Sequence, residues 1–219
     1  MTASYEYDVH LPPNAEPGKK YPAIFTLHGK GSNEKNMHGL VEPLSDKFII
    51  VHIRGDLPLG AGYQYYELRG LGNPVRESFD RSVRKLEDFL EEATVKYPID
   101  ATNRYLLGFS QGAILSMTLA LTLGDRLKGI VALNGYIPEF VKTEYPLRSV
   151  ENVSVFISHG QYDSVFPLEI GRANAAYFGG RTSRCVFRSY PADHGVSEEN
   201  QKDFVEWLLQ NINTTTDKE

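Results

Sequence analysis

Seven short apolar runs, separated by segments with helical periodicity, limit the folds open to this chain more than any other sequence feature. The runs are Tyr5–Leu11, Tyr21–Leu27, Phe48–Ile53, Arg104–Phe109, Gly129–Leu133, Val153–Ser158 and Arg184–Tyr190. Short, continuous apolar strands are typical of a sheet that is covered on both faces. The alternation therefore predicts an α/β fold, with a mostly parallel central sheet flanked by helices.

Four segments between these runs have the spacing expected of helices. The first is expected to begin at Asn73-Pro74, because Asn is a favoured N-cap and Pro is favoured at the first helical position. Apolar residues then recur at spacings of three and four, at positions 79, 83, 86, 90 and 93. The other predicted helices are Gly112–Leu123, Pro167–Phe178 and Val196–Ile212.

One uncharged stretch, Tyr105–Gly124, is about as long as a membrane span. It contains two glycines before its apolar helical part, together with serine, glutamine and threonine residues. We therefore interpret it as a buried strand that runs into a buried helix. No integral membrane association is expected.

Composition sets the remaining limits. The length of 219 residues favours one domain, at residues 1–212, with a polar tail at 213–219. A net charge of −5 argues against nucleic-acid binding, which needs clustered Lys and Arg. The lone Cys185 excludes an internal disulfide and a multi-cysteine zinc site. The N-terminal residues do not show the basic region followed by an apolar region that is typical of a secretory signal. Together with the lone cysteine, this leads us to expect a cytoplasmic location.

The segment Gly108–Gly112 has the pattern G-x-S-x-G, with Ser110 at its centre. The pattern alone is weak, but here it lies between a predicted strand and a predicted helix, which is the context it requires. A sharp turn would expose the Ser110 hydroxyl, and side chains at the two glycine positions would collide with the strand and the helix. This predicts a nucleophilic serine, whereas the plain alternative is a glycine-rich turn with a helix-capping serine.

A serine hydroxyl needs a base, and in chain order an acid and then a histidine are expected after it. Only His159 and His194 follow Ser110, and His194 lies in a loop after the last predicted strand. Asp163 follows the preceding strand by a short loop, whereas Asp193 adjoins His194 too closely to orient its ring. Ser110, Asp163 and His194 are therefore the predicted catalytic residues, and His159 is expected to shape the Asp163 turn.

The glycine-rich turn after the second apolar run predicts an oxyanion hole. It would bring the backbone N–H of Lys30 beside Ser110, while Gln111 supplies a second N–H at the start of the helix. His28 is expected to fix this loop by hydrogen bonds. Aromatic and apolar residues on nearby loops predict an acyl or aryl pocket, for which the site residues chosen are Tyr66, Tyr136, Ile137 and Phe166.

Five blocks together resemble the phospholipase/carboxylesterase family, which includes bacterial carboxylesterases and acyl-protein thioesterases. They are LHGKGSN (27–33), GFSQGA (108–113), LNGYIP (133–138), HGQYDSVFP (159–167) and ADHGV (192–196). The resemblance implies a compact α/β-hydrolase with a Ser-Asp-His triad and no cofactor. It also implies that the triad is Ser110, Asp163 and His194, and that the oxyanion N–H groups are those of Lys30 and Gln111.

The chain departs from the family pattern near the site. Asn134-Gly135 stands where the family often has Ser-Gly, and Asp163-Ser164 stands where it often has Asp-Pro. Tyr66 replaces the more usual Trp or Phe of an aromatic loop. None of these positions belongs to the triad, but each could alter the acyl pocket.

The predicted function is a serine carboxylesterase for short- to medium-chain esters, acting through an acyl-enzyme on a small-molecule substrate. The one sizeable insertion near the site, Tyr136–Val150, leaves no room for a large lid. An acyl-protein or acyl-carrier thioesterase, or a lysophospholipase, would use the same triad. A non-catalytic binding module is the alternative from another class. No metal-ligand spacing appears, no cofactor is expected, and the sequence leaves a homodimer open.

Overall fold

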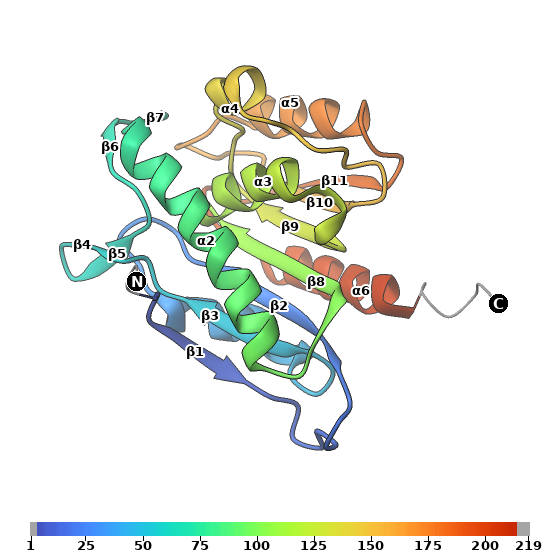
Figure 1. Cartoon of the computed structure of the whole chain (residues 1–219). Helices are drawn as coiled ribbons and strands as arrows, with labels where there is room; N and C mark the ends of the chain where they lie inside the picture. Colours follow the sequence, from blue (N-terminus) through green and yellow to red (C-terminus); the bar gives the residue numbers. More distant parts are fainter. Residues whose placement is uncertain (1–3, 214–219) are drawn as a thin grey trace.

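The computed structural model describes residues 4–213, and a twisted seven-stranded sheet forms its centre (Figure 1). The strand order is β1-β3-β2-β8-β9-β10-β11, and only β1 runs antiparallel to its neighbour. The strands are β1 (Tyr7–His10), β2 (Tyr21–Leu27), β3 (Ile49–Ile53), β8 (Ile99–Phe109), β9 (Gly129–Leu133), β10 (Ser154–Gly160) and β11 (Cys185–Tyr190). The prediction of a mostly parallel sheet is confirmed.

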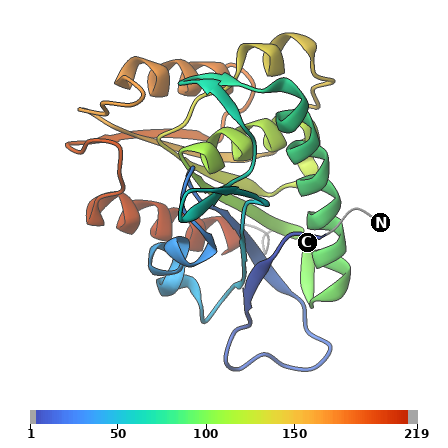
Figure 2. The same cartoon turned by 90° about the vertical axis from the view of Figure 1, so that its left-hand side faces the viewer.

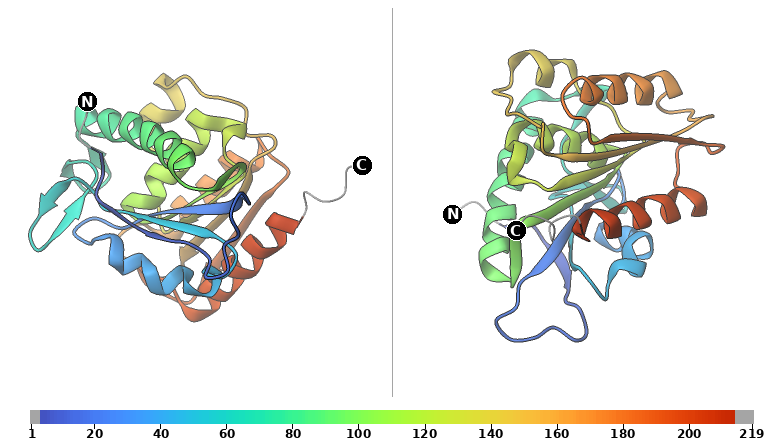
Figure 3. Two further views of the ribbon diagram at one scale, coloured as in Figure 1. Left: turned by 60° about the horizontal axis from the view of Figure 1, so that its bottom comes forward. Right: turned by 90° about the vertical axis from the view of Figure 1, so that its right-hand side faces the viewer.

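Helices cover both faces of this sheet, as Figures 2 and 3 show. They are α1 (His38–Val41), α2 (Arg76–Lys96), α3 (Gln111–Leu123), α4 (Glu139–Glu144), α5 (Leu168–Gly179) and α6 (Glu198–Asn213). One core cluster joins the sheet to α2, α3, α4 and α5, and a second joins its other face to α1 and α6. The inner strands are apolar on both faces for this reason, since each face is buried against helices.

The uncharged stretch at 105–124 forms the end of β8 and the whole of α3. Nearly every residue of α3 is buried, which explains why this helix has no polar face. Across residues 4–213, no helix combines the length and the apolar character that crossing a membrane requires. The interpretation as a buried strand followed by a buried helix is confirmed.

The expected helix start at Asn73-Pro74 is wrong. These two residues form β7, which pairs with β6 (Leu68–Gly70) in a small hairpin, and α2 begins at Arg76. Gly72 has φ +71°, so it turns the chain back before Asn73 could act as a cap. A second small hairpin, of β4 (Leu57–Leu59) and β5 (Gly62–Gln64), was also not predicted.

The parallel strands end at one edge of the sheet, so the segments that follow them meet there. Segments after β2, β8, β10 and β11 contain the residues predicted for the site. The expected polar tail at 213–219 lies outside the described residues except for its first position.

Candidate active site

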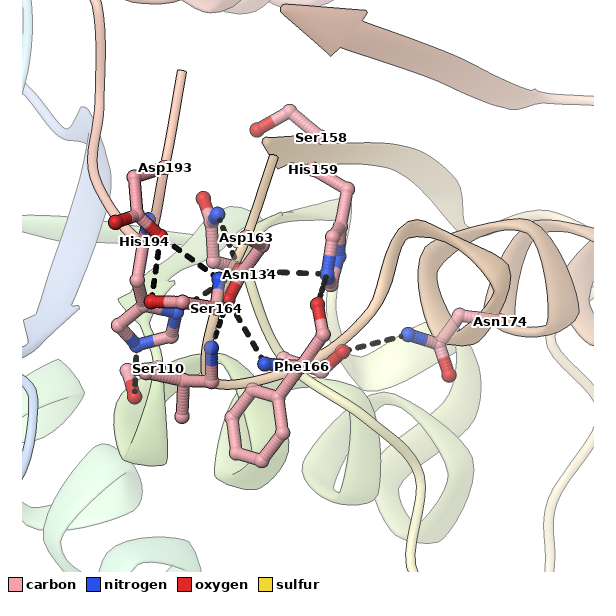
Figure 4. A network of polar contacts seen from close by, with 12 residues as sticks. Ser110, Asn134, Ser158, His159, Asp163, Ser164, Phe166, Asn174, Asp193 and His194 are labelled. Atoms are coloured by element: carbon pink, nitrogen blue, oxygen red, sulfur yellow. Dashed lines mark hydrogen bonds and ion pairs between the residues drawn. The ribbon is translucent and has the colours of Figure 1, made fainter. Parts of the chain in front are cut away.

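Three loops bring a serine, a histidine and an aspartate into one line of hydrogen bonds (Figure 4). The Ser110 Oγ lies 2.9 Å from His194 Nε2, and His194 Nδ1 lies 2.9 Å from Asp163 Oδ2. An ionised carboxylate only accepts hydrogen bonds, so Nδ1 carries the proton and Nε2 is left to accept from the serine hydroxyl. This is the arrangement in which an imidazole can act as a base toward a serine.

Ser110 lies at the sharp turn between β8 and α3, with φ +53°. The backbone reaches this left-handed conformation because the strand and the helix pack without side chains between them. A Cβ built on Gly108 would lie 2.1 Å from the Gly112 carbonyl oxygen, and one built on Gly112 would lie 2.0 Å from the Leu27 carbonyl oxygen. Both glycines are therefore required for the close approach of the turn to its neighbours.

Gly112→Ala is expected to destabilise the protein by about 3 kcal/mol or more, because its Cβ would overlap backbone atoms that cannot move independently. Gly179→Ala, at the end of α5, is the matched control, since a Cβ there meets nothing within 4 Å. Urea unfolding of both variants measures the difference. Equal stability of the two variants would show that the turn tolerates a side chain.

The carboxylate of Asp163 is held by four donors. Its Oδ1 accepts from the N–H groups of Val165 and Phe166, each at 2.8 Å, and its Oδ2 accepts from Asn134 Nδ2 at 2.9 Å as well as from His194. Burial by itself would raise the pKa of Asp163, but these hydrogen bonds outweigh it and hold the pKa below its usual range. The group therefore stays ionised near neutral pH.

His159 contacts the same turn through its ring. Its Nε2 lies 2.7 Å from the Phe166 carbonyl oxygen and 3.4 Å from Asp163 Oδ2. The side chain is fully buried, so the contact closes the loop that presents Asp163. The expectation that His159 shapes the Asp163 turn is confirmed.

The loop that presents His194 is fastened by Asp193, and sequence reasoning found no role for this residue. Asp193 Oδ1 accepts from both the N–H and the hydroxyl of Ser164, at 2.7 and 2.8 Å, and from the N–H of His194. Ser164 and Asn134 are two of the departures from the family pattern, and each donates to an acid of this network. A proline at position 164 would have neither donor.

The loop after β2 lies against Ser110. A Cβ on Gly29 would lie 3.6 Å from the Ser110 Cβ. His28 fixes the loop as expected, since its Nε2 accepts from the Gly55 N–H and its Nδ1 donates to the Gly29 carbonyl. Within residues 4–213, the backbone N–H groups of Lys30 and Gln111 donate no hydrogen bond.

A pocket of about 580 Å³ opens beside Ser110 and His194. Three of the four predicted pocket residues, Tyr66, Tyr136 and Phe166, line it together with Lys30 and Gln111. Ile137 does not line it, because its buried side chain faces a neighbouring hollow near Asn174. Burial raises the pKa of Tyr136 to about 12, so its hydroxyl is neutral in the pocket wall.

Sequence reasoning missed one whole wall of the pocket, the segment at 68–72 of the β6–β7 hairpin. The paired glycines at 70 and 72 were the available signal for a turn. Gln111 holds the neighbouring segment Tyr65-Tyr66 in position. Its side-chain amide accepts from the Tyr65 N–H and donates to the Tyr66 carbonyl. Gln111 therefore links the serine turn to the pocket wall through its side chain.

In the described part of the chain, no three His, Cys, Asp or Glu side chains are grouped as a metal site would require. The sheet order, the strained serine turn and the serine-histidine-aspartate line define the chain as an α/β-hydrolase. A match of the phospholipase/carboxylesterase family covers residues 14–214, and the chain belongs to that family. It is a serine hydrolase of the carboxylic ester class.

Similar proteins include an acyl-protein thioesterase and two carboxylesterases. Acyl-protein thioesterase 1 of Candida albicans is 26% identical over 227 residues, which cover 91% of this chain and 95% of that protein. Carboxylesterase SOBER1 of Arabidopsis thaliana is 23% identical, over 65% of this chain and 63% of that protein. The crystal structure of the Bacillus cereus carboxylesterase superposes with a TM-score of 0.84 at 20% identity and covers 96% of each chain, a likeness that shows the fold.

Proposed function

We propose that this chain is a carboxylesterase that hydrolyses short- to medium-chain esters through an acyl-enzyme on Ser110. His194 takes the proton of the attacking hydroxyl and returns it to the leaving alcohol. Asp163 orients His194 and stabilises its charged form. Water then attacks the acyl-enzyme with His194 again as the base, which releases the acid and restores Ser110.

The observation that carries this proposal is the unbroken line from Ser110 through His194 to Asp163, with both distances at 2.9 Å. Such a line both activates the hydroxyl and fixes the tautomer of the base. A turn that merely caps a helix would not need it. In addition, Ser110 makes no side-chain capping bond to α3.

The N–H groups of Lys30 and Gln111 are the proposed oxyanion donors. Both residues line the pocket beside Ser110, and neither N–H has a partner within the described residues. Unused backbone donors next to a nucleophile can stabilise the negative charge that develops on the carbonyl oxygen, an effect typically worth a factor of about 10² to 10³ in rate.

The pocket supports a small ester. Its volume of about 580 Å³ lies within the usual range for sites that bind small molecules. Much of its wall is formed by tyrosine, phenylalanine and aliphatic side chains, which suit an apolar acyl or aryl group.

A thioesterase acting on acylated proteins is the second candidate, and it is favoured by the similarity to acyl-protein thioesterase 1 of Candida albicans over nearly the whole chain. The proposed residues would serve either reaction. Matched oxygen and sulfur esters with the same acyl group separate the two functions. A higher kcat/KM for the thioester, by more than the intrinsic difference in reactivity, would favour the thioesterase.

Turnover of p-nitrophenyl esters, from acetate to palmitate, is expected to be highest for short chains and to fall toward palmitate, as the proposed substrate class requires. Steady-state kinetics across the series measure this dependence on chain length. Faster cleavage of micellar long-chain esters would exclude the proposed substrate class.

A further inference from the structure

Among the described residues, the charged side chains that line the pocket beside Ser110 include cations but no acids. Its lining includes two permanent cations, Lys30 and Arg69, and it includes no Asp or Glu. The chain as a whole carries a net charge of −5, so cations without acids in the pocket run against the overall composition. The rest of the lining consists largely of apolar side chains and glycine, so these two cations are the charged groups that a bound substrate would meet in the wall.

Neither cation is neutralised by the protein. Within residues 4–213, the side chains of Lys30 and Arg69 form no ion pair and no hydrogen bond. In this part of the chain, five of the other arginines are paired with acids, such as Arg54 with Glu6 and Arg104 with Glu91, whereas Arg69 is not. The guanidinium of Arg69 therefore remains free to bind an anion from solution.

The backbone that carries Arg69 is held in place over the pocket. Leu68 pairs with Pro74 in the β6–β7 hairpin, and the Val75 N–H donates to the Glu67 carbonyl. The Glu67 N–H donates to the Ser78 hydroxyl, which ties the hairpin to the first turn of α2. Arg69 lies between the paired residues Leu68 and Gly70, at a shift in the register of the hairpin that forms part of the wall.

We propose that the natural substrate carries an anionic group, a carboxylate or a phosphate, which Arg69 binds at the pocket mouth with Lys30 adding to the attraction. This inference rests on the proposed esterase function and specifies its substrate class. A guanidinium suits this task because its planar fork can bind two oxygens of a carboxylate or phosphate at once. The anionic group could belong to the acyl part or to the alcohol part of the ester.

Two pairs of esters test the proposal and show whether the anionic group belongs to the acyl part or to the alcohol part. On the acyl side, p-nitrophenyl hexanoate is compared with the p-nitrophenyl monoester of adipic acid. On the alcohol side, the butyrate of 4-ethylphenol is compared with that of 4-hydroxyphenylacetic acid. Within each pair a methyl group is replaced by a carboxylate, so the ratio of kcat/KM, anionic over neutral, reports the preference for charge.

The wild-type ratio is expected to exceed one for one of the pairs, and Arg69→Gln is expected to lower it about tenfold. Arg69→Glu should reverse the preference, and Arg69→Lys should retain part of it. The ratio should also fall as salt rises, because an exposed charge is screened. Arg148→Gln is the matched control, since exposed Arg148 lies at the far end of α3 and its N–H donates to the Leu121 carbonyl; it should keep the wild-type ratio.

Wild-type ratios of one or less for both pairs, or a ratio unchanged in Arg69→Gln, would overturn the proposal. In that case, hydrolysis of the neutral esters that is lost in Ser110→Ala would still support the proposed function. Failure to hydrolyse any of the four esters would overturn the esterase function and this inference together.

Discussion

Replacing Ser110 by alanine is expected to lower kcat for a p-nitrophenyl ester by about 10⁵-fold to 10⁶-fold, which is the scale of losing the nucleophile of a serine hydrolase. The variant keeps the pocket and the free N–H groups of Lys30 and Gln111, so it should still bind the ester. The fold should also survive. The backbone bonds of Ser110, its N–H to the Leu133 carbonyl and its carbonyl to the Ile114 N–H, do not involve the side chain.

Ser116→Ala provides the matched control for this experiment. Ser116 lies in α3, which follows Ser110, and is fully buried, but its hydroxyl only donates to the Gly112 carbonyl one turn earlier. Its activity should remain close to that of the wild type. Turnover that survives in Ser110→Ala, at the wild-type melting temperature, would show that another group attacks the ester.

Asp163→Asn is expected to lower kcat by about 10⁴-fold. An amide at this position can present its NH₂ group to His194, which favours the tautomer with the proton on Nε2, where it can no longer accept from Ser110. The donors from Val165 and Phe166 would still hold the side chain, so the geometry of the loop should change little. A loss of less than tenfold would mean that His194 is oriented by other contacts.

The same variant should reveal a pH-dependent stability. The folded pKa of Asp163 lies below its unfolded value, so the carboxylate stabilises the fold above the unfolded pKa, at about 4. This contribution is lost as the pH falls through the lower folded pKa. The difference in unfolding free energy between wild type and Asp163→Asn should therefore be constant from pH 7 to about 5 and shrink below 4, as urea unfolding at each pH would measure.

The fold could be predicted from the sequence because its main signals are local. The apolar runs mark the strands of the central sheet, and the pattern that begins at Phe79 marks the buried face of α2. The start of that helix was misplaced because two signals compete there. Asn73 and Pro74 have the composition of a helix start, but the turn at Gly72 and the pairing with β6 hold them in a strand.

The candidate triad could also be selected from the sequence, since each residue follows a strand at the same edge of the sheet. What the sequence could not supply was the set of groups around them. Asn134 is 29 residues from Asp163, and Asp193 is 29 residues from Ser164. Contacts at such separations depend on how neighbouring strands and loops are placed, and no local spacing encodes them.

Local signals were enough to place the strands of the central sheet, most of its larger helices and the glycines that the serine turn needs, because backbone conformation and hydrophobic burial act over a few residues. The side chains that line the pocket depend instead on how distant segments pack. It placed Arg69 and Leu71 of the β6–β7 hairpin in the wall and turned Ile137 away from it. The reason is that a pocket is the space left between packed elements, so its walls come from segments that meet only after the chain has folded.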